Sequence, residues 1–255
     1  MRDHHEKEIE MYAQKSGMYH LLARYYQYID PNKHMMYYKK HYEYMKKLAA
    51  VYETRENDVA AANTAAVRLF HASPDIDAVD IHVNGQKVLH RLKYKQISQY
   101  LKLPTGQYQF DIYPTGQTRS PILSETVYIL PSLRYTVAAC GKTNRLQLLP
   151  FFDNPYVPYG ETKIRFAYLS PDVPAVNIAL KDGDVLFKNV RYKDVTDYTK
   201  VPTDQRLTLE LRDTETDEVM MVVPNVRFGP NRGYTIIASG YTKETPSLEA
   251  VLIEE

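Results

Sequence analysis

The chain has 255 residues, which is enough for two ordinary domains and an extension, and its 32 basic and 31 acidic residues leave a formal net charge of +1. This balance provides no overall field that would attract nucleic acid or an anionic membrane, so neither is an expected partner. The single cysteine cannot form a disulfide within the chain.

The first 62 residues differ in composition from the rest, because they hold ten of the 23 tyrosines, six of the eight methionines and five of the eight histidines. Apolar residues at three- and four-residue spacing predict helices over about 6–28 and 33–52. Asp30-Pro31-Asn32 predicts a turn between them. We therefore expect a helical hairpin, with faces formed by Ile9, Tyr12, Leu21, Leu22, Tyr25 and Tyr28 and by Met35, Tyr38, Tyr42, Met45, Ala49 and Tyr52.

The tyrosines of this extension have a packing interpretation and an interaction interpretation. At helical spacing they can simply form the seam of the hairpin. Ten tyrosines exceed what one such seam buries, and tyrosine is typical of interfaces, which favours docking on a protein partner, a second copy or the chain's own later domains. Oxidative tyrosine cross-linking is a sharper variant of this idea. The residues predicted to carry the interaction are Tyr25, Tyr28, Tyr38, Tyr42 and Tyr52.

Beyond a linker over 53–66, the periodicity changes from that of a helix to the alternation of strands, and Asn84-Gly85 marks a hairpin turn. The strands expected in this part of the chain cover 67–72, 79–83, 87–92, 107–113, 122–130, 135–141 and 146–152, and then 164–168, 176–180, 185–190, 207–212, 219–224, 234–240 and 248–253. About seven short strands per ninety residues is the pattern of a β-sandwich.

The strand region is a duplication, since residues 67–81 return as residues 164–178 with seven of fifteen positions identical. We predict three domains: the helical hairpin and linker at 1–62, a first sandwich at 63–154 and a second at 155–255. The proline-bearing connection over 153–160 is expected to hold the two sandwiches in a restricted orientation. The predicted fold class is mainly β, with two tandem immunoglobulin-like β-sandwiches preceded by an N-terminal α-helical hairpin.

Several segments of the first repeat resemble a bacterial family, the domain-of-unknown-function 4397 family that is common in Gram-positive bacteria. They are the His-Ala-Ser-Pro-Asp segment at 71–75, residues 78–85, Tyr100 with the Leu-Pro-Thr-Gly turn at 103–106, and the Tyr-Thr-Val segment at 135–137. Both repeats match. The resemblance implies tandem immunoglobulin-like sandwiches, usually on exported or surface-attached proteins, and it implies no activity. The chain departs from this pattern by its tyrosine-rich extension and by an N-terminus without an apolar signal region.

The Ser-Pro-Asp segment is the most prominent candidate site. Two imidazoles and two carboxylates lie close to this segment and could in principle bind a metal ion. The second repeat replaces most of these ligands. The corresponding positions are His71 and Tyr168, Asp75 and Asp172, Asp80 and Asn177, and His82 and Ala179. Pro and Asp are turn-building residues, so a structural turn is the main expectation. We predict no metal site and no cofactor, and keep His71, Asp75 and Asp172 as the residues of a possible ligand loop.

The sequence carries none of the motifs that position a nucleophile, a zinc ion or a phosphate. Cys140 lies in an apolar run and is expected to be a buried core residue rather than a reactive thiol. We therefore predict a protein that is not an enzyme and has no catalytic residues. A hydrolase would instead require a cleft with converging carboxylates.

These observations favour a structural or interaction protein of a bacterial surface or spore-coat-type assembly, which associates through the tyrosine-rich helices. It is expected to be made in the cytoplasm without a signal peptide and without a membrane span. The alternative is a module that binds a cell-wall glycan or peptide with its sandwich loops. The first hypothesis places the interaction in residues 1–62, and the second in residues 63–255.

Overall fold

The computed structural model describes residues 2–27, 29–53, 64–172 and 175–255, and within the helices it describes side chains at residue 9 and over 11–48 except 28 and 31. The chain divides into two compact units, one formed by Met1–Thr64 with Leu130–Ser132, and the other by Ala65–Ile129 with Leu133–Glu255. Mainly β structure with two N-terminal helices confirms the predicted fold class. In the described part of the chain, no helix has the length and apolar character needed to cross a membrane.

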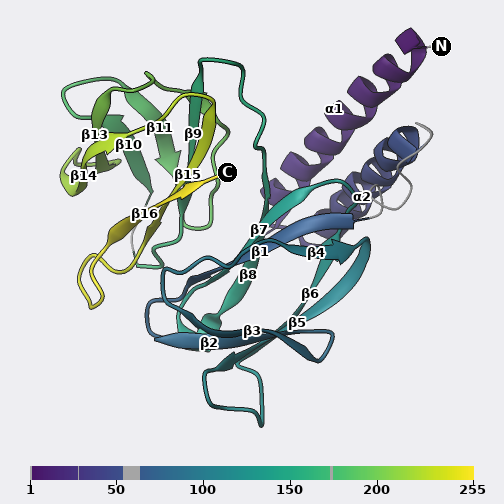
Figure 1. Ribbon diagram of the computed structural model, residues 1–255, viewed down its shortest axis with the longest axis horizontal. Coiled ribbons are helices and arrows are strands. Elements are labelled where there is room, and N and C mark those ends of the chain that lie inside the picture. Colours follow the sequence, from purple (N-terminus) through teal and green to yellow (C-terminus); the bar gives the residue numbers. More distant parts are fainter. Residues whose placement is uncertain (1, 28, 54–63, 173–174) are drawn as a thin grey trace. The chain divides into compact units, whose positions relative to one another are not determined.

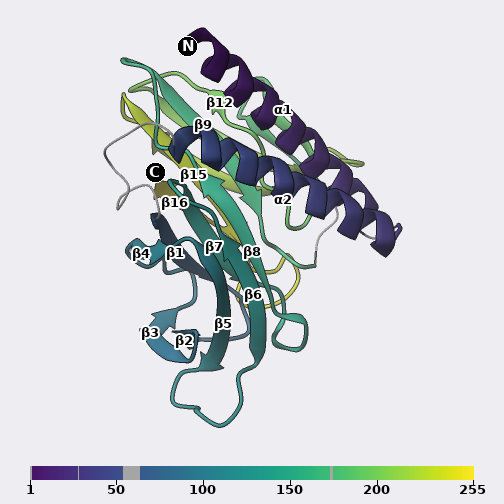
Figure 2. The ribbon, with the colours of Figure 1, turned by 90° about the vertical axis from the view of Figure 1, so that its right-hand side faces the viewer.

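The first unit is a helical hairpin of α1 (Arg2–Tyr26) and α2 (Pro31–Glu53), seen as the paired helices in Figures 1 and 2. Asp30 explains where α2 begins, because its Oδ1 accepts hydrogen bonds from the backbone N–H groups of Asn32 and Lys33, both at 3.1 Å. An aspartate cap followed by proline at the first helical position is a strong start signal. The predicted turn is thus correct, and the helix begins two residues earlier than expected.

The structure brings only part of the predicted helix faces into the seam of the hairpin. Met35 and Tyr38 are exposed, and so are Leu21 and Tyr25 of α1. These four residues therefore lie outside the seam, whereas Tyr12 of the predicted α1 face lies within it. The helices instead meet through small and aromatic residues at three- and four-residue spacing, which are Tyr12, Ser16, Tyr19, Ala23 and Tyr26 of α1 and His34, Tyr37, His41 and Tyr44 of α2.

The second unit contains two β-sandwiches with the same strand plan (Figure 1). The first consists of β1 (Thr64–Ala72), β2 (Ala78–Val83), β3 (Gln86–Lys93), β4 (Leu101–Pro104), β5 (Gly106–Pro114), β6 (Leu123–Ile129), β7 (Arg134–Cys140) and β8 (Gln147–Asp153). The second consists of β9 (Thr162–Tyr168), β10 (Val176–Leu180), β11 (Val185–Val190), β12 (Thr199–Lys200), β13 (Arg206–Asp213), β14 (Val219–Arg227), β15 (Arg232–Ser239) and β16 (Glu249–Glu254). The expected strands are present; the short β4 and β12 were not predicted.

Each sandwich is made of two four-stranded sheets, ordered β4-β1-β7-β8 and β3-β2-β5-β6 in the first repeat, and β12-β9-β15-β16 and β11-β10-β13-β14 in the second. The first strand of each repeat pairs in parallel with the seventh, as β1 with β7 and β9 with β15. The predicted Asn-Gly turn is present, with φ values of 49° at Asn84 and 77° at Gly85. The duplication therefore preserves both sheet order and strand direction.

Strands β1, β7, β9 and β15 are buried on both of their faces, which explains why they are almost continuously apolar. One face of β9 and β15 contributes to the core of the second sandwich, through residues such as Ile164 and Phe166. The opposite faces form a second cluster that joins the two repeats; we call it the inter-repeat cluster. It contains Phe70, Ala72, Ala138, Cys140 and Phe151 of the first repeat and Ala167, Leu169, Ile237 and Ile253 of the second.

A buried charge network adjoins the inter-repeat cluster and joins the repeats reciprocally. The Nε of Arg68 donates to Thr136 Oγ1 at 2.8 Å, and the Nε of Arg165 donates to Thr235 Oγ1 at 2.8 Å. Each guanidinium then donates to a backbone carbonyl of the other repeat, Arg68 to Glu254 and Arg165 to Phe152.

Two carboxylates at corresponding positions complete this charge network. Asp153 lies 2.6 Å from Arg165 Nη2, and Glu255 lies 3.1 Å from the same nitrogen. Arg68 approaches the same two carboxylates at 3.2 and 3.7 Å. Each repeat makes the same kind of contact to the other that it receives from it, as in the isologous interface of a symmetric dimer. Duplication has thus placed a dimer-like interface inside one chain.

Candidate functional site

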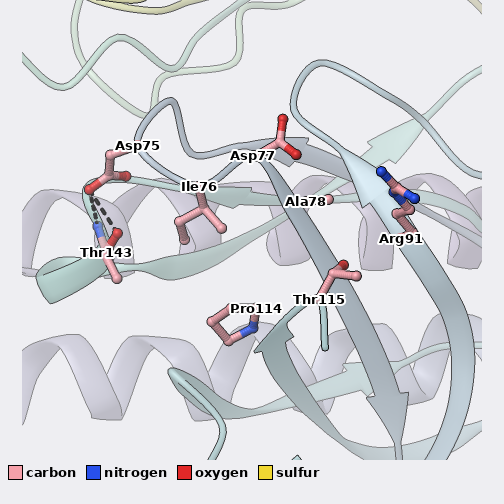
Figure 3. A pocket seen from close by; sticks show the side chains of 8 residues that line it. All are labelled: Asp75, Ile76, Asp77, Ala78, Arg91, Pro114, Thr115 and Thr143. Carbon is pink, nitrogen blue, oxygen red and sulfur yellow. Dashed lines mark hydrogen bonds between the residues drawn. The ribbon is translucent and has the colours of Figure 1, made fainter. Parts of the chain in front are cut away.

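The Ser-Pro-Asp segment after β1 forms a tight corner held by its own side chains. Ser73 donates to the carbonyl of Gly141 at 2.6 Å and to Asp75 Oδ1 at 2.9 Å. Asp75 Oδ2 accepts from both the backbone N–H and the hydroxyl of Thr143 at 2.8 Å (Figure 3). Burial opposes ionisation of Asp75, but the bonds from Thr143 and Ser73 outweigh it and lower the pKa of the carboxyl.

The second repeat builds the same corner from the corresponding residues. Ser170 donates to the carbonyl of Gly240 at 2.8 Å and to Asp172 Oδ1 at 2.9 Å. Asp172 Oδ2 accepts from the backbone N–H of Thr242 at 2.9 Å and from its hydroxyl at 3.2 Å. Two copies with identical bonding indicate that the shared Ser and Asp connect the first corner of each sandwich to the end of its seventh strand, as turn-building residues.

His71 lies beneath this corner rather than on its surface. The imidazole is fully buried; its Nε2 donates to the carbonyl of Ile76 at 2.9 Å, and its Nδ1 accepts from the N–H of Ser73. Burial lowers the pKa of His71 to about 4, against the opposing effect of the Ile76 bond. In this position the imidazole orders the turn, and a ligand role for the loop would fall to its exposed residues.

We expect the stability of the sandwich unit to depend on the protonation of His71. A folded-state pKa near 4, below the ordinary 6.5, means that folding favours the neutral imidazole, so its contribution is complete above pH 6.5 and is lost as pH falls toward 4. Integrated over that range, the loss approaches ~3 kcal/mol. Urea unfolding at several pH values should show a decline between pH 6.5 and 4 that flattens in His71→Gln; an unchanged slope would contradict the assignment.

Asp80, on β2, is a buried carboxylate near the corner. Lys87 Nζ lies at 2.8 Å, His90 Nδ1 at 3.0 Å and the backbone N–H of Arg91 at 2.9 Å. Burial alone would raise the pKa of Asp80, but these donors outweigh it and hold the pKa well below its usual range. In the second repeat Asn177 Oδ1 accepts from the N–H of Asn189 at 2.9 Å, so the backbone bond is conserved between repeats while the charge is not.

A pocket of about 480 Å³ opens beside the corner of the first repeat. Figure 3 shows its lining, which comes from the corner, the end of β3, the end of β5 and the segment after β7, namely Asp75, Ile76, Asp77, Ala78, Arg91, Pro114, Thr115 and Thr143. Asp77 and Arg91 supply opposite charges, and Thr115 supplies a hydroxyl. Of the predicted ligand-loop residues, the structure brings Asp75 to this pocket; His71 is not among its lining residues, and Asp172 belongs to the other repeat.

The charged part of the pocket is specific to the first repeat. The positions that correspond to Asp77 and Arg91 carry Pro174 and Asn189 in the second. Sequence reasoning missed Arg91 and Thr115 because they join the corner only through the folding of β3 and β5. The sequence signal that could have identified this pocket is that the charges of Asp77 and Arg91 occur in the first repeat and are absent from the second.

The predicted interaction tyrosines lie at several kinds of position. Tyr25 and Tyr38 are exposed, whereas Tyr42 is half-buried. Tyr28 lies outside the described residues, and so does the side chain of Tyr52. The exposed large apolar residues of α1 that face away from the seam are Met11, Met18, Leu21 and Tyr25; we call them the outer stripe.

Among the described residues, no group of three or more His, Cys, Asp or Glu side chains is placed to hold a metal ion. Cys140 is fully buried in the inter-repeat cluster, and burial raises the pKa of its thiol to about 11. This thiol is a packing residue, as its apolar sequence context predicts.

Two β-sandwiches with equal strand order, identical corners and a reciprocal interface define a tandem-repeat sandwich protein. The chain belongs to the family described as Domain of unknown function (DUF4397), whose model matches residues 65–179 and 169–255. The two matches confirm the tandem arrangement inferred from the sequence repeat. No curated protein matches the chain.

Two solved structures are distantly similar to the chain. One is the Bacillus anthracis TIE protein, with 12% identity over 70% of this chain and 34% of that one, and a TM-score of 0.24. Another is a putative cell adhesion protein from Bacteroides fragilis, with 12% identity over 74% of this chain and 97% of that one, and a TM-score of 0.19. The chain spans about a third of the Bacillus anthracis protein, and similarity at this level carries no functional argument.

Proposed function

We propose that this chain is a non-enzymatic structural protein that associates with copies of itself or with another protein through its helical hairpin, in a bacterial surface or spore-coat-type assembly. The observation that carries the proposal is the outer stripe. Leu21 and Tyr25 are 67% and 65% exposed, although they are among the largest apolar side chains of α1.

The composition of α1 supports this proposal further. A helix in a two-helix hairpin needs one apolar face, and α1 already has one in the seam. The outer stripe gives it a second apolar face on the opposite side, at a spacing that fits contact with another helix or a flat surface. An exposed apolar stripe of this kind is typical of an interaction site. The paired sandwiches would then serve as a rigid body that the hairpin connects to its neighbours.

We propose synthesis in the cytoplasm and deposition on a spore or cell-surface assembly, where the hairpin mediates attachment. The tandem sandwiches support such a role because their mutual packing buries charges and apolar groups that a flexible pair of domains would leave to solvent. A rigid repeat unit is well suited to forming an ordered layer.

The outer stripe is tested by adding charge to it in the full chain. We expect L21K/Y25K to abolish self-association or binding to the partner, measured by sedimentation equilibrium, while far-UV circular dichroism keeps its helical signal. The matched control, A13K/Q27K, adds the same charge at exposed positions outside the stripe and should associate like the unmodified chain. Equal association of all three proteins would refute the role of the stripe.

A second candidate function, binding of a cell-wall glycan or peptide, is favoured by the first-repeat pocket. Its Asp77, Arg91 and Thr115 offer both charges and a hydroxyl at one concave place, which suits a polar ligand. Two double variants separate the two candidate functions. D77N/R91N should lose co-sedimentation with insoluble cell wall if the pocket binds it, whereas L21K/Y25K should lose association if the hairpin carries the function.

A further inference from the structure

The seam of the hairpin contains a continuous ladder of five tyrosine rings, Tyr12, Tyr44, Tyr19, Tyr37 and Tyr26 in spatial order. Successive ring centroids are separated by 6.2, 5.5, 6.2 and 5.5 Å. The rings come alternately from α1 and α2, so every step of the ladder crosses from one helix to the other. We call this set the tyrosine ladder.

Packing alone does not explain why these positions hold tyrosine. Leucine is a better helix former and the usual residue of a helical seam, and α1 does contain it. Yet Leu21 points outward, while Tyr19 and Tyr26 occupy the seam. If burial of apolar area alone determined the seam, leucine would lie inside it and tyrosine outside. The opposite placement indicates that the phenol rings have a function other than packing.

Two steps of the ladder have geometry suited to ring-to-ring bond formation. Tyr19 and Tyr44 lie 5.5 Å apart with an interplanar angle of 16°, and Tyr26 and Tyr37 lie 5.5 Å apart with an angle of 22°. Near-parallel offset rings bring carbons next to the phenol oxygens of both residues within reach of a small side-chain rotation. The four side chains are half-buried, which disfavours coupling with another molecule.

Lysine ammonium groups lie over the faces of the ladder rings. Lys33 is 5.0 Å from the Tyr26 centroid, Lys40 is 5.3 Å from that of Tyr19, and Lys47 is 5.0 Å from that of Tyr44. A cation over a ring opposes the build-up of positive charge on it. Removal of an electron is therefore coupled to loss of the phenol proton, which produces the neutral phenoxyl radical that couples through carbon.

We propose that the tyrosine ladder is a modification site at which oxidation joins α1 to α2 covalently, through a bond between Tyr19 and Tyr44 and another between Tyr26 and Tyr37. Each tyrosine loses one electron and its phenol proton, and the two radicals form a carbon–carbon bond between ring positions adjacent to oxygen. The hydrogen on each bonded carbon then moves to the phenol oxygen and restores both rings. Each bond thus releases two electrons and two protons, which reduce one hydrogen peroxide to two waters at a peroxidase.

Tyr25 provides the entry point for the oxidant. It is 65% exposed, and its ring centroid lies 4.9 Å from that of Tyr26, at one end of the ladder. A peroxidase that oxidises this exposed ring can transfer the radical along neighbouring rings to the half-buried pairs. The inference goes beyond the proposed function, because the covalent bonds form in the seam between the two helices, although Tyr25 also belongs to the outer stripe. The product is a hairpin whose two helices can no longer separate.

The test treats the dilute full-length chain with a haem peroxidase and limiting hydrogen peroxide, followed by trypsin and mass spectrometry. We expect the peptide 16–24, which contains Tyr19, joined to the peptide 41–46, which contains Tyr44, with a mass two hydrogens below the sum. An equal mixture of isotope-labelled and unlabelled chains should give cross-links within one isotope only. The oxidised chain should also retain its helical circular dichroism to higher temperature.

Peptide 41–46 supplies its own matched control, because it also contains Tyr42, whose ring is not part of the ladder. Tyr44→Phe keeps the stacked ring but removes the phenol, and should abolish the 16–24 to 41–46 product; Tyr42→Phe should leave it intact. Unchanged far-UV circular dichroism in both variants excludes misfolding as the cause. Absence of the product in the unmodified chain, its survival in Tyr44→Phe, or mixed-isotope cross-links at these peptides would overturn the proposal.

Discussion

Replacement of Asp153 by alanine is expected to destabilise the sandwich unit by about 3–5 kcal/mol, because it leaves two buried guanidinium groups without the nearer of their two shared carboxylates. The Asp153 side chain has no exposed surface. It lies 2.6 Å from Arg165 and 3.2 Å from Arg68, and it also accepts hydrogen bonds from Tyr100 and Thr136. Alanine removes all of these partners together, and the charges of Arg68 and Arg165 then repel each other in a poorly hydrated place.

The control for Asp153→Ala is an ion pair of similar length on the surface. Lys200 lies 2.7 Å from Glu161, but its side chain is largely exposed, and Lys200→Ala should change the free energy of unfolding by ~1 kcal/mol or less. Both variants are measured by urea unfolding of the full chain, monitored by a β-sheet signal. Equal and small effects of the two substitutions would show that the buried network does not hold the repeats together.

The second large effect is expected at Phe151, which is 8% exposed and belongs to the inter-repeat cluster. Phe151→Ala should cost about 3–5 kcal/mol, because it removes a buried ring and leaves a cavity between two sheets. The ring also lies 4.8 Å from the guanidinium carbon of Arg165, so the substitution additionally loosens the charge network. The unfolding midpoint in urea should fall, with little change in helical content.

Its neighbour Phe152 is a matched control on the same strand. The side chain points to the opposite face of β8 and is 41% exposed, with the ring of Tyr135 at 5.0 Å. Phe152→Ala should therefore cost roughly half as much as Phe151→Ala or less. If the order of the two effects were reversed, the inter-repeat cluster would not be the principal contact between the sandwiches.

The strands were predictable because the repeat supplied two readings of each element. Alternation around Val79 and the Asn84-Gly85 turn indicated the β2–β3 hairpin, and the corresponding strands recurred in the second repeat. Edge strands of two to four residues, such as β4 and β12, are too short to show a recognisable alternation of apolar and polar residues. The parallel pairing of β1 with β7 depends on contacts far apart in the chain, which a local pattern does not encode.

The buried charge network was missed for a related reason. Arg68 alternates with Val67 and Leu69, and such alternation normally places the charged residue in solvent. Here the outer face of the sheet packs on the other repeat, so the arginine is buried. The signal was present in Phe70 and Ala72, which share the face of Arg68 and are apolar.

The hairpin showed the limits of periodicity in a helix with two apolar faces. The predicted face of α1 combined Tyr12 with Leu21 and Tyr25, because more than one stripe of such a helix satisfies the spacing rule. The structure places Tyr12 in the seam together with Tyr19 and leaves Leu21 and Tyr25 exposed. The candidate site was also predicted only in part. Asp75 was identified from its motif, whereas Arg91 reaches the pocket only through the fold.

Association through the hairpin can be measured from the mass of the full-length chain in solution. Sedimentation equilibrium over a wide concentration range should show a mass above that of the monomer, and L21K/Y25K should return it to the monomer mass. If the chain stays monomeric at every concentration and binds no protein partner through residues 1–62, the hairpin does not mediate association.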